Sequence, residues 1–565
     1  MVATALGAFA LPTINGVRSE YNTATVDGVI GTTRGYNNLD TPPNLDAIAE
    51  VKVLQSNYQA EYGKAMGSNV NIVTKSGTQQ FHGTAYYYVR NEAFNANNYF
   101  TNLNGLPRPR YRDNTIGGNF GGPIFWPGKF NPAKNKLFAF FSQEYLPIKS
   151  PDGIKFYTVP TALQRKGDLS QTFDTNGKLI PIKDPANGGV QFTNNIIPAN
   201  RINSTTQALL NIFPLPNFTN TAISGNNYNY ITNNAANQPT SQSILRLDYN
   251  ITDKWRMFFR GLNMVVNNDG FSSPANADPW LARANYRTHN PNVAINVVWA
   301  ATPTLVNELT LGTAFWTEDQ ILTPDNLKLL QKGNDGINLG QLYPPLNPLG
   351  LIPQMSFGGV PNAAGGGPNG RFPLEDVVSN YDVTDGVTKI WNQHTFKFGA
   401  DVEFDTYLQK HMGGSFAGNF AFDKKTNNPF DTNYAYSNAL PGSFSSYSEI
   451  NNRPDYKPHT RVFEWYAQDQ WHVTKKLTLD LGVRFTLGLP QTIQNGSNFI
   501  PDLYNRAQAP VLFVPAKLGG QNVLRGIRLA MARPRSAVAS ASSCMPALAR
   551  AKRAIWFRIH RIFSR

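Results

Sequence analysis

Residues 476–485 read KLTLDLGVRF, and their side chains change polarity at nearly every step. Successive side chains of a strand point to opposite faces, so a period of two indicates a β-strand with one apolar face. The apolar row comprises Leu477, Leu479, Leu481, Val483 and Phe485, and the other row comprises Lys476, Thr478, Asp480, Gly482 and Arg484. A soluble sheet gives the same alternation, so this segment alone does not identify a membrane protein.

Loop lengths separate the two possibilities. Four short turns join segments of this kind, near residues 252–254, 301–304, 392–394 and 473–475. Long stretches rich in Asn, Gly and Pro lie between the hairpins, at about 150–241, 267–289, 318–376 and 409–458. Loops this long are uncommon in compact soluble domains, whereas outer-membrane barrels have short turns at one end and long loops at the other. The sequence therefore predicts a mainly β fold, an antiparallel transmembrane β-barrel, and a soluble β-sandwich or adhesin is the alternative.

The physics of the bilayer agrees with this prediction. Backbone N–H and C=O groups need internal partners in hydrocarbon, so a spanning sheet must close on itself. About 9–11 residues per tilted strand are enough to cross. Tryptophans near the predicted strand ends are typical of the two aromatic girdles of a barrel, although they would also suit a sandwich core. These are Trp255, Trp299, Trp316, Trp391, Trp465 and Trp471.

Composition excludes several classes of protein. No apolar run approaches the ~18 residues of a transmembrane helix. The net charge is +14, but residues 526–565 hold nine Lys or Arg and no acidic residue, which leaves 42 basic and 37 acidic residues before them. The basic character belongs mostly to this tail, so we expect no nucleic-acid partner. The single cysteine, Cys544, allows no intramolecular disulfide and no cysteine cluster for zinc.

The chain divides into three parts by character. Residues 1–80 predict a small α/β plug domain, with a helical turn at 45–48 and strands around 51–53 and 70–73; residues 81–525 predict the barrel with its long loops; residues 526–565 form a basic Ala/Arg-rich tail. The tail abandons the alternation, so we expect it to be out of frame, foreign or disordered. The alternative is a basic amphipathic segment on an anionic membrane surface. The N-terminal MVATALGAFALPTING has no basic region, so we expect the true start and the signal peptide to be missing from this chain.

Several motifs point to one family. Val26-Asp27-Gly28 precedes AEYG at 60–63, NIVTKSGT at 71–78, FHG at 81–83 and GGNFGGPI at 117–124, and WYAQDQWHVTKKLTLDLGVRF occupies 465–485. Together these segments resemble the plug-to-barrel junction and a barrel hairpin of TonB-dependent outer-membrane transporters, in particular the Oar-like branch. The resemblance covers roughly residues 12–525.

The resemblance implies a plug inside a barrel of about 22 strands. It implies a Gram-negative outer-membrane location, contact with outer-membrane lipid, and uptake of an unidentified small ligand of the siderophore, glycan or peptide class. A TonB-type energy-transducing complex would drive that uptake. We count about a dozen strands and see no coupling box, so we expect an internal fragment. The alternatives are a surface adhesion, structural or secretion-related barrel, a soluble secreted β-protein, and a non-functional fragment.

No catalytic constellation, metal-spaced histidine pair or cofactor motif stands out, so we expect neither an enzyme nor a cofactor or metal site. The Gly-rich GGNFGG and GGGPNG segments lack the strand–helix context of a phosphate loop, and we interpret them as flexible loops. The plug carries the functional candidates, which by resemblance form its motif and gate: Asp27, Gly28, Glu61, Tyr62, Gly63, Thr74, Lys75 and Gly77, with Arg18 and Arg34 nearby. Alternation predicts that the polar faces of the barrel strands place six charged residues toward the plug. These are Arg246, Asp248, Arg256, Arg260, Asp401 and Glu403. The simpler alternative is that the plug residues only cap turns.

Overall fold

The structure is a computed structural model of the whole chain. It describes residues 11, 13–14, 16–32, 39–55, 58–65, 67–103, 105–151, 154–232, 235–272, 283–333, 336–368, 373–411, 413–494, 497–498, 514–515 and 554–561.

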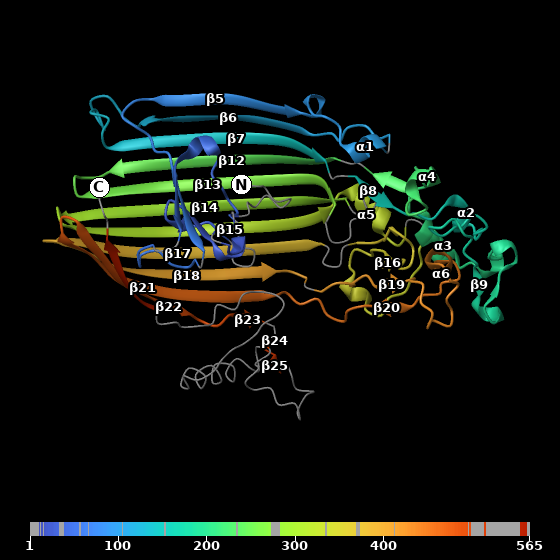
Figure 1. Cartoon of the computed structure of the whole chain (residues 1–565). Helices are drawn as coiled ribbons and strands as arrows, with labels where there is room; N and C mark the ends of the chain where they lie inside the picture. Colours follow the sequence, from blue (N-terminus) through green and yellow to red (C-terminus); the bar gives the residue numbers. More distant parts are fainter. Residues whose placement is uncertain are drawn as a thin grey trace.

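One large antiparallel sheet dominates the molecule, and we call it the wall (Figure 1). It has 13 strands, in the order β26-β22-β21-β18-β17-β15-β14-β13-β12-β7-β6-β5, with β23 on β21. The wall strands lie beside one another in the order in which they occur along the chain, as expected for a meander built from hairpins. The strands are β5 (His82–Asn91), β6 (Arg112–Pro123), β7 (Leu137–Pro151), β12 (Ala235–Asn250), β13 (Trp255–Ser272), β14 (Arg283–Thr302), β15 (Leu305–Leu322), β17 (Leu374–Trp391), β18 (His394–Gln409), β21 (Lys457–Thr474), β22 (Leu477–Gly488), β23 (Thr492–Gln494) and β26 (Ala554–Arg561).

The four predicted hairpins are confirmed. They are β12–β13, β14–β15, β17–β18 and β21–β22, and each is joined by a short turn. Ile295 lies opposite Leu311, and Trp465 lies opposite Phe485, so the apolar rows of paired strands share one face. The rings of Trp465 and Phe485 stack with their centroids 5.5 Å apart. Cross-strand aromatic pairs of this kind stabilise a sheet.

The strands are longer than the apolar rows that predicted them. Residues 267–289 were expected to be a loop, but Asn267–Ser272 continue β13 and Arg283–His289 belong to β14. β14 is 20 residues long, about twice what a membrane crossing needs. Backbone pairing persists beyond the hydrocarbon, where side chains no longer need to alternate, so hydropathy alone underestimates the strands.

Two further expectations need correction. Trp316, assigned to an aromatic girdle, is instead only 4% exposed, and it lines a cavity between the plug and the wall. Trp255, Trp299, Trp391 and Trp465 are exposed, as girdle residues would be. GGNFGG at 117–122 is a regular part of β6 and not a flexible loop. Its glycines permit close packing, since a Cβ on Gly117 would lie 2.4 Å from the Tyr86 ring.

A second, four-stranded sheet lies against one face of the wall, and we call the described residues between 16 and 80 the plug (Figure 1). Its strand order is β2-β1-β4-β3. Ala24, Val26, Val70 and Ile72 are buried and form part of its apolar core. The predicted turn at 45–48 and both predicted strand regions are present, and the described helical turns are 3-10 helices. The elements are η1 (Ser19–Tyr21), β1 (Thr23–Val26), β2 (Val29–Ile30), η2 (Leu45–Ala47), β3 (Ile48–Gln55) and β4 (Ser68–Thr74).

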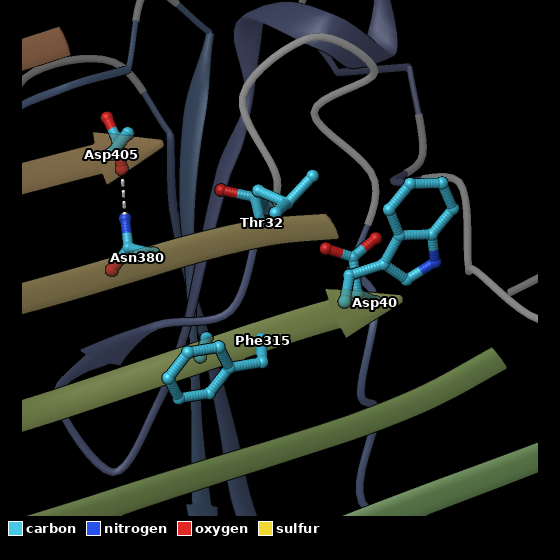
Figure 2. A pocket seen from close by; sticks show the side chains of 8 residues that line it. Thr32, Asp40, Phe315, Asn380 and Asp405 are labelled. Atoms are coloured by element: carbon cyan, nitrogen blue, oxygen red, sulfur yellow. Dashed lines mark hydrogen bonds between the residues drawn. The ribbon is translucent and has the colours of Figure 1, made fainter. Parts of the chain in front are cut away.

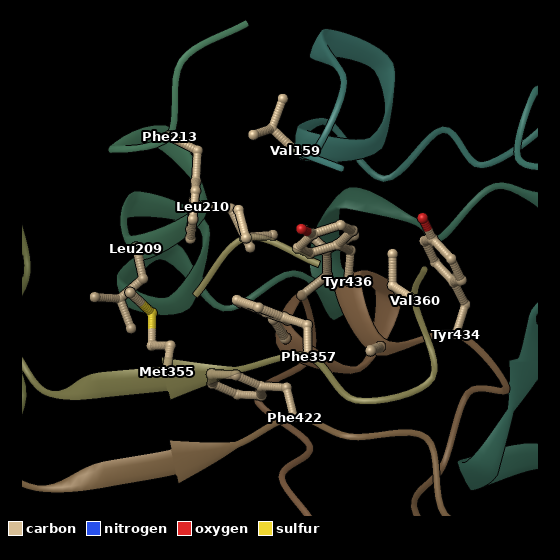
Figure 3. Packing of buried hydrophobic residues seen from close by; sticks show 14 of the residues in the cluster. Val159, Leu209, Leu210, Phe213, Met355, Phe357, Val360, Phe422, Tyr434 and Tyr436 are labelled. Atoms are coloured by element: carbon tan, nitrogen blue, oxygen red, sulfur yellow. The ribbon is translucent and has the colours of Figure 1, made fainter. Parts of the chain in front are cut away.

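The long connections between hairpins do not extend separately into solvent. Three of them, residues 152–234, 323–373 and 410–456, fold together at one end of the wall, and we call their described part the cap (Figure 1). The cap has its own apolar core, in which Phe357 packs against Phe213, Phe422 and Tyr436 (Figure 3). Its elements are β8 (Lys155–Tyr157), α2 (Ala162–Arg165), β9 (Lys183–Asp184), η4 (Pro185–Asn187), β10 (Val190–Gln191), η5 (Thr193–Asn195), η6 (Ala199–Arg201), α3 (Ser204–Asn211), α4 (Thr221–Ser224), β11 (Tyr230–Thr232), α5 (Pro324–Leu330), η7 (Pro344–Leu346), β16 (Gln354–Ser356), β19 (Asn419–Ala421), α6 (Ala435–Ala439) and β20 (Ser446–Ser448).

Backbone hydrogen bonds join the three cap segments to one another. The Lys183 N–H donates to the Thr432 carbonyl (3.0 Å), and the Asn203 N–H donates to the Leu440 carbonyl (2.8 Å). β16 and β19 come from different connections and pair in parallel. Because each segment supplies partners to the others, the cap is one folded body.

The described part of the wall ends in an edge strand on each side. Among the described residues, β5 pairs with β6 alone and β26 with β22 alone, so the wall has two edges. Of the basic tail, Ala554–Arg561 form β26; the rest lies outside the described residues, and its disordered or foreign character stays a prediction. No described helix is long and apolar enough to cross a bilayer. The other elements are η3 (Glu92–Phe94), α1 (Tyr99–Leu103), β24 (Ser497–Asn498) and β25 (Val514–Pro515).

Candidate functional site

The plug meets the wall first at the tip of its β1–β2 hairpin. Val26 pairs with Val29, so Asp27 and Gly28 form a two-residue turn. Both have positive φ, +50° and +85°. A hairpin of this type needs two left-handed residues, and Asp-Gly is a preferred choice for them. The turn therefore explains the sequence Val-Asp-Gly, and it presents the Asp27 carboxylate at the point nearest the wall.

Asp27 accepts four hydrogen bonds. Arg246 Nη1 (3.0 Å) and Thr74 N (2.9 Å) donate to Oδ1, and Arg260 Nε (3.1 Å) and Thr74 Oγ1 (2.8 Å) donate to Oδ2. The backbone and side-chain bonds from Thr74 fix the carboxylate from within the plug. The two arginines come from adjacent wall strands, so one buried anion joins the plug to β12 and β13.

Arg260 is fully buried by this contact, with 0% of its side chain exposed. Its guanidinium also donates to the Val26 carbonyl (2.8 Å) and to the Asn292 carbonyl (3.0 Å). A buried guanidinium is tolerated only when it is paired and hydrogen-bonded. Arg260 therefore depends on the plug for its neutralising charge.

Arg246 shares its charge between two carboxylates. It contacts Asp27, and its Nη2 also donates to Asp248 Oδ1 (3.0 Å) on its own strand. Its guanidinium lies over the Phe258 ring, 4.3 Å from the centroid. Asp248 keeps 24% of its side chain exposed, so it is the better-solvated partner.

A plug loop, residues 58–65, makes a second attachment farther along the same sheet. Lys397 Nζ donates to both Glu61 oxygens (2.7 and 2.8 Å). Arg484 Nη1 donates to the Glu61 carbonyl (3.0 Å) and also pairs with Glu464. Gln468 Oε1 accepts from the Glu61 N–H (2.9 Å). The loop is thus held by β18, β21 and β22.

Lys64 forms the third attachment. Its Nζ lies 2.6 Å from Asp401 Oδ1, 3.0 Å from Glu403 Oε2 and 3.4 Å from Asp382 Oδ1. The residue has φ +63°, and its carbonyl accepts from Thr23 Oγ1 (3.0 Å). Burial lowers the pKa of Lys64, but the three carboxylates outweigh this effect and leave its pKa above the usual range. The ammonium therefore remains charged in the folded protein.

The structure brings together most of the predicted site residues. Arg246 and Arg260 both contact Asp27, which Thr74 holds in place. Asp248 pairs with Arg246. Asp401 and Glu403 also contact the plug, but their partner is Lys64, which was not a predicted site residue. Arg256 lies on the same strand face as Arg260 but is exposed, and no ion pair among the described residues joins it to the plug. Tyr62 contacts the Tyr58 ring and lies under Lys52 Nζ, 5.7 Å from the centroid. Lys75 and Arg18 have no ion pair within the described part of the chain, and Arg34 lies outside it.

Glycines allow the plug and wall to approach closely. A Cβ on Gly77 would lie 2.4 Å from the Ala139 carbonyl oxygen of β7, and one on Gly312 would lie 2.4 Å from Val29 Cγ1. A Cβ on Gly63 would lie 2.2 Å from Arg484 Nε. Non-bonded contacts this short do not occur, so a Cβ at any of these three positions would force the neighbouring atoms to shift.

Gly77→Ala is therefore expected to destabilise the junction between plug and wall. The methyl group meets rigid backbone of β7, so we expect a loss of about 1–3 kcal/mol, as for overpacking. Heat-modifiable migration after thermal challenge measures this loss. Gly340→Ala is the matched control, because a Cβ there meets nothing within 4 Å; equal stability of the two variants would contradict the close contact.

A cavity of about 10 Å³, enough for about one water molecule, lies between the plug and β15, β17 and β18 (Figure 2). Thr32 and Asp40 of the plug line one side, and Trp316, Asn380 and Asp405 line the wall side. The Asn380 amide donates to Asp405, as the dashed line in Figure 2 shows. No group of His, Cys, Asp and Glu suited to a metal ion occurs within the described ranges.

The sequence did not single out Lys64, Lys397, Arg484 and Asp382 as site residues. Alternation already placed Lys397 and Arg484 on polar strand faces, but nothing in that pattern pairs them with Glu61. Lys64 directly follows AEYG, and its positive φ is not signalled by its residue type. The sequence pointed to Arg18, Arg34 and Lys75 as the plug cations instead.

A family model described as "Outer membrane beta barrel domain" matches residues 73–541. The TonB-dependent transporter Oar of Myxococcus xanthus is 30% identical over 73 residues, which are 13% of this chain and 7% of that protein.

Two solved structures are among those similar to this chain. The outer membrane transporter YddB from Escherichia coli has 9% identity and a TM-score of 0.49, covering 85% of this chain and 51% of that one. The siderophore receptor PirA from Acinetobacter baumannii has 13% identity and a TM-score of 0.41, covering 85% and 50%. The chain thus spans about half the length of these structures.

Proposed function

Because the chain belongs to the outer-membrane β-barrel family and is located in the Gram-negative outer membrane, we propose that it works as a plugged, TonB-dependent transporter. Its ligand would pass between plug and wall after an inner-membrane energy-transducing complex displaces part of the plug. The ligand class, whether siderophore, glycan or peptide, is not fixed by this proposal. The resemblance of residues 12–525 to the Oar-like branch supports it.

The buried carboxylate of Asp27 is the observation that carries the proposal. It joins a separate plug sheet to two wall strands through Arg246 and Arg260. A residue that only capped a turn would be satisfied by Thr74 and would need no arginine from the wall. Three apolar wall residues, Phe140, Ile244 and Leu262, also pack in one cluster with the plug core, so a directed pull on the plug has to break apolar contacts as well as these ion pairs.

The Glu61 attachment gives the first test of gating. Both side chains of the Glu61–Lys397 pair are partly exposed, so the pair is worth only about 0–1 kcal/mol. Glu61→Lys places two ammonium groups together, and we expect about a fivefold faster entry of nitrocefin into whole cells. The double variant with Lys397→Glu restores the opposite charges and is expected to restore the seal. Unchanged entry in Glu61→Lys would argue against a gating role for this contact.

Energy dependence separates transport from a structural barrel. A single cysteine at position 61, in a protein with Cys544→Ser, is expected to react with a water-soluble maleimide faster in energised cells than after proton-gradient collapse. Equal rates would contradict coupling to an energy source. The compact cap would suit surface adhesion as well, and loss of cell contact on cap disruption together with equal labelling rates would favour that second function.

A further inference from the structure

The side of β17 and β18 that faces the plug is strongly acidic. Asp382 lies directly opposite Glu403 in the strand register, so their side chains share one face. Alternation places three more carboxylates on that face. All five are buried: Asp376, Asp382, Asp401, Glu403 and Asp405.

The plug supplies the charge that neutralises three of these carboxylates. Lys64 Nζ lies within 3.4 Å of Asp401, Glu403 and Asp382. Two basic side chains of this part of the wall contribute to other pairs, since Lys397 pairs with Glu61 and Arg484 with Glu464. When the plug loop moves away, Lys64 leaves with it, and buried carboxylates without a cation are costly.

An independent feature of the same surface also fits a cation. Asn380 is only 5% exposed, and its amide nitrogen donates to Glu403 (3.1 Å) and Asp405. Its carbonyl oxygen accepts no hydrogen bond from any described residue. Asn380 lines the cavity in Figure 2 together with Asp40 and Asp405. A buried acceptor without a donor is unfavourable, and an ammonium or guanidinium N–H would satisfy it.

We propose that the wall surface covered by Lys64 is a cation-selective section of the lumen, and that the solute carries an ammonium or guanidinium group which replaces the Lys64 ammonium. This inference rests on the proposed function and adds the charge of the substrate. Acidic rings select cations in channels for the same electrostatic reason. Arg246 and Arg260, on β12 and β13, are paired with Asp27.

The test compares two variants of one plug loop in planar bilayers. Lys64→Gln uncovers acidic wall, whereas Glu61→Gln, the matched control, uncovers the basic Lys397. In a KCl gradient we expect a K⁺ to Cl⁻ permeability ratio about fivefold higher for Lys64→Gln than for Glu61→Gln. Adding Asp401→Asn and Glu403→Gln to Lys64→Gln is expected to abolish the difference. Equal ratios in the two single variants would overturn the inference.

Spermidine serves as the probe for an organic cation. It is expected to block the Lys64→Gln current at about tenfold lower concentration than in the variant that also lacks the two carboxylates; equal block would overturn the inference. If neither single variant conducts, the urea-opened comparison below decides the inference, and the energy dependence of labelling at position 61 decides the proposed function separately.

A folding defect in Lys64→Gln does not remove the test. Wild-type protein opened by urea is then compared with Asp401→Asn/Glu403→Gln opened in the same way. A cation preference confined to the wild type supports the inference, and its absence there overturns it. Lys64→Arg keeps the charge and is expected to stay sealed.

Discussion

Asp27→Asn is expected to unseat the plug and admit large antibiotics to the cell. The substitution keeps the size of the side chain but removes the charge that neutralises Arg260, which is fully buried. Removing one partner of a buried ion pair costs about 3–5 kcal/mol, because the other charge is left uncompensated. A loss of this size lowers the ratio of seated to unseated plug by more than a hundredfold. Vancomycin sensitivity of whole cells measures it.

Asp248→Asn is the matched control for this substitution. Asp248 contacts the same Arg246, but 24% of its side chain is exposed. We expect about 0–1 kcal/mol for its loss and little change in vancomycin sensitivity. If both variants behaved alike, or if Asp27→Asn cells stayed resistant, the buried pair would not be what holds the plug.

Phe357→Ala is expected to unfold the cap while leaving the wall intact. Phe357 is 2% exposed and contacts the rings of Phe213, Phe422 and Tyr436, so these four rings together join the three chain segments of the cap. Truncation of a buried Phe costs about 3–5 kcal/mol. The substitution removes a ring that joins all three segments, so we expect rapid chymotrypsin cleavage within residues 152–234, 323–373 and 410–456.

Phe430→Ala is the control within the same cap. Its side chain is 63% exposed, so we expect cleavage at the wild-type rate. Heat-modifiable gel migration should persist in both variants, since both residues belong to the cap. A Phe357→Ala cap as resistant as the wild type would show that the three connections fold independently.

The wall could be predicted from the sequence because its signal is local and periodic. Leu245, Leu247 and Tyr249 alternate with Arg246 and Asp248, and each strand repeats the pattern beside a short turn. The extent of the strands could not be predicted in this way. Above the apolar rows, Asn and Thr side chains continue the ladder on both faces, and no hydropathy signal marks them as strand.

The cap could not be predicted for a different reason. Its core residues come from connections far apart in the sequence, and Val159, Leu209, Phe357 and Phe422 follow no shared period. Each connection alone is rich in polar and turn-forming residues. The core exists only when the three segments meet, so composition suggests solvated loops.

Sequence reasoning could predict some residues of the plug site but not all of their partners. Asp27, Arg246 and Arg260 were selected as charged residues on predicted facing surfaces, and the structure brings them together. Pairing across more than 200 positions leaves no local trace, so Glu61 was not matched with Lys397. Lys64 was missed because its acidic partners lie on strands 318 or more positions away.

The central claim is that one face of each wall strand meets lipid while the other faces the plug. Single spin labels at positions 477–485, placed one at a time in a Cys544→Ser protein reconstituted in bilayers, test it most directly. The account predicts that collisions with lipid-dissolved oxygen peak at 477, 479, 481, 483 and 485 and fall at every position between them. Odd positions shielded from oxygen and water alike, as inside a two-layered soluble sandwich, would contradict it.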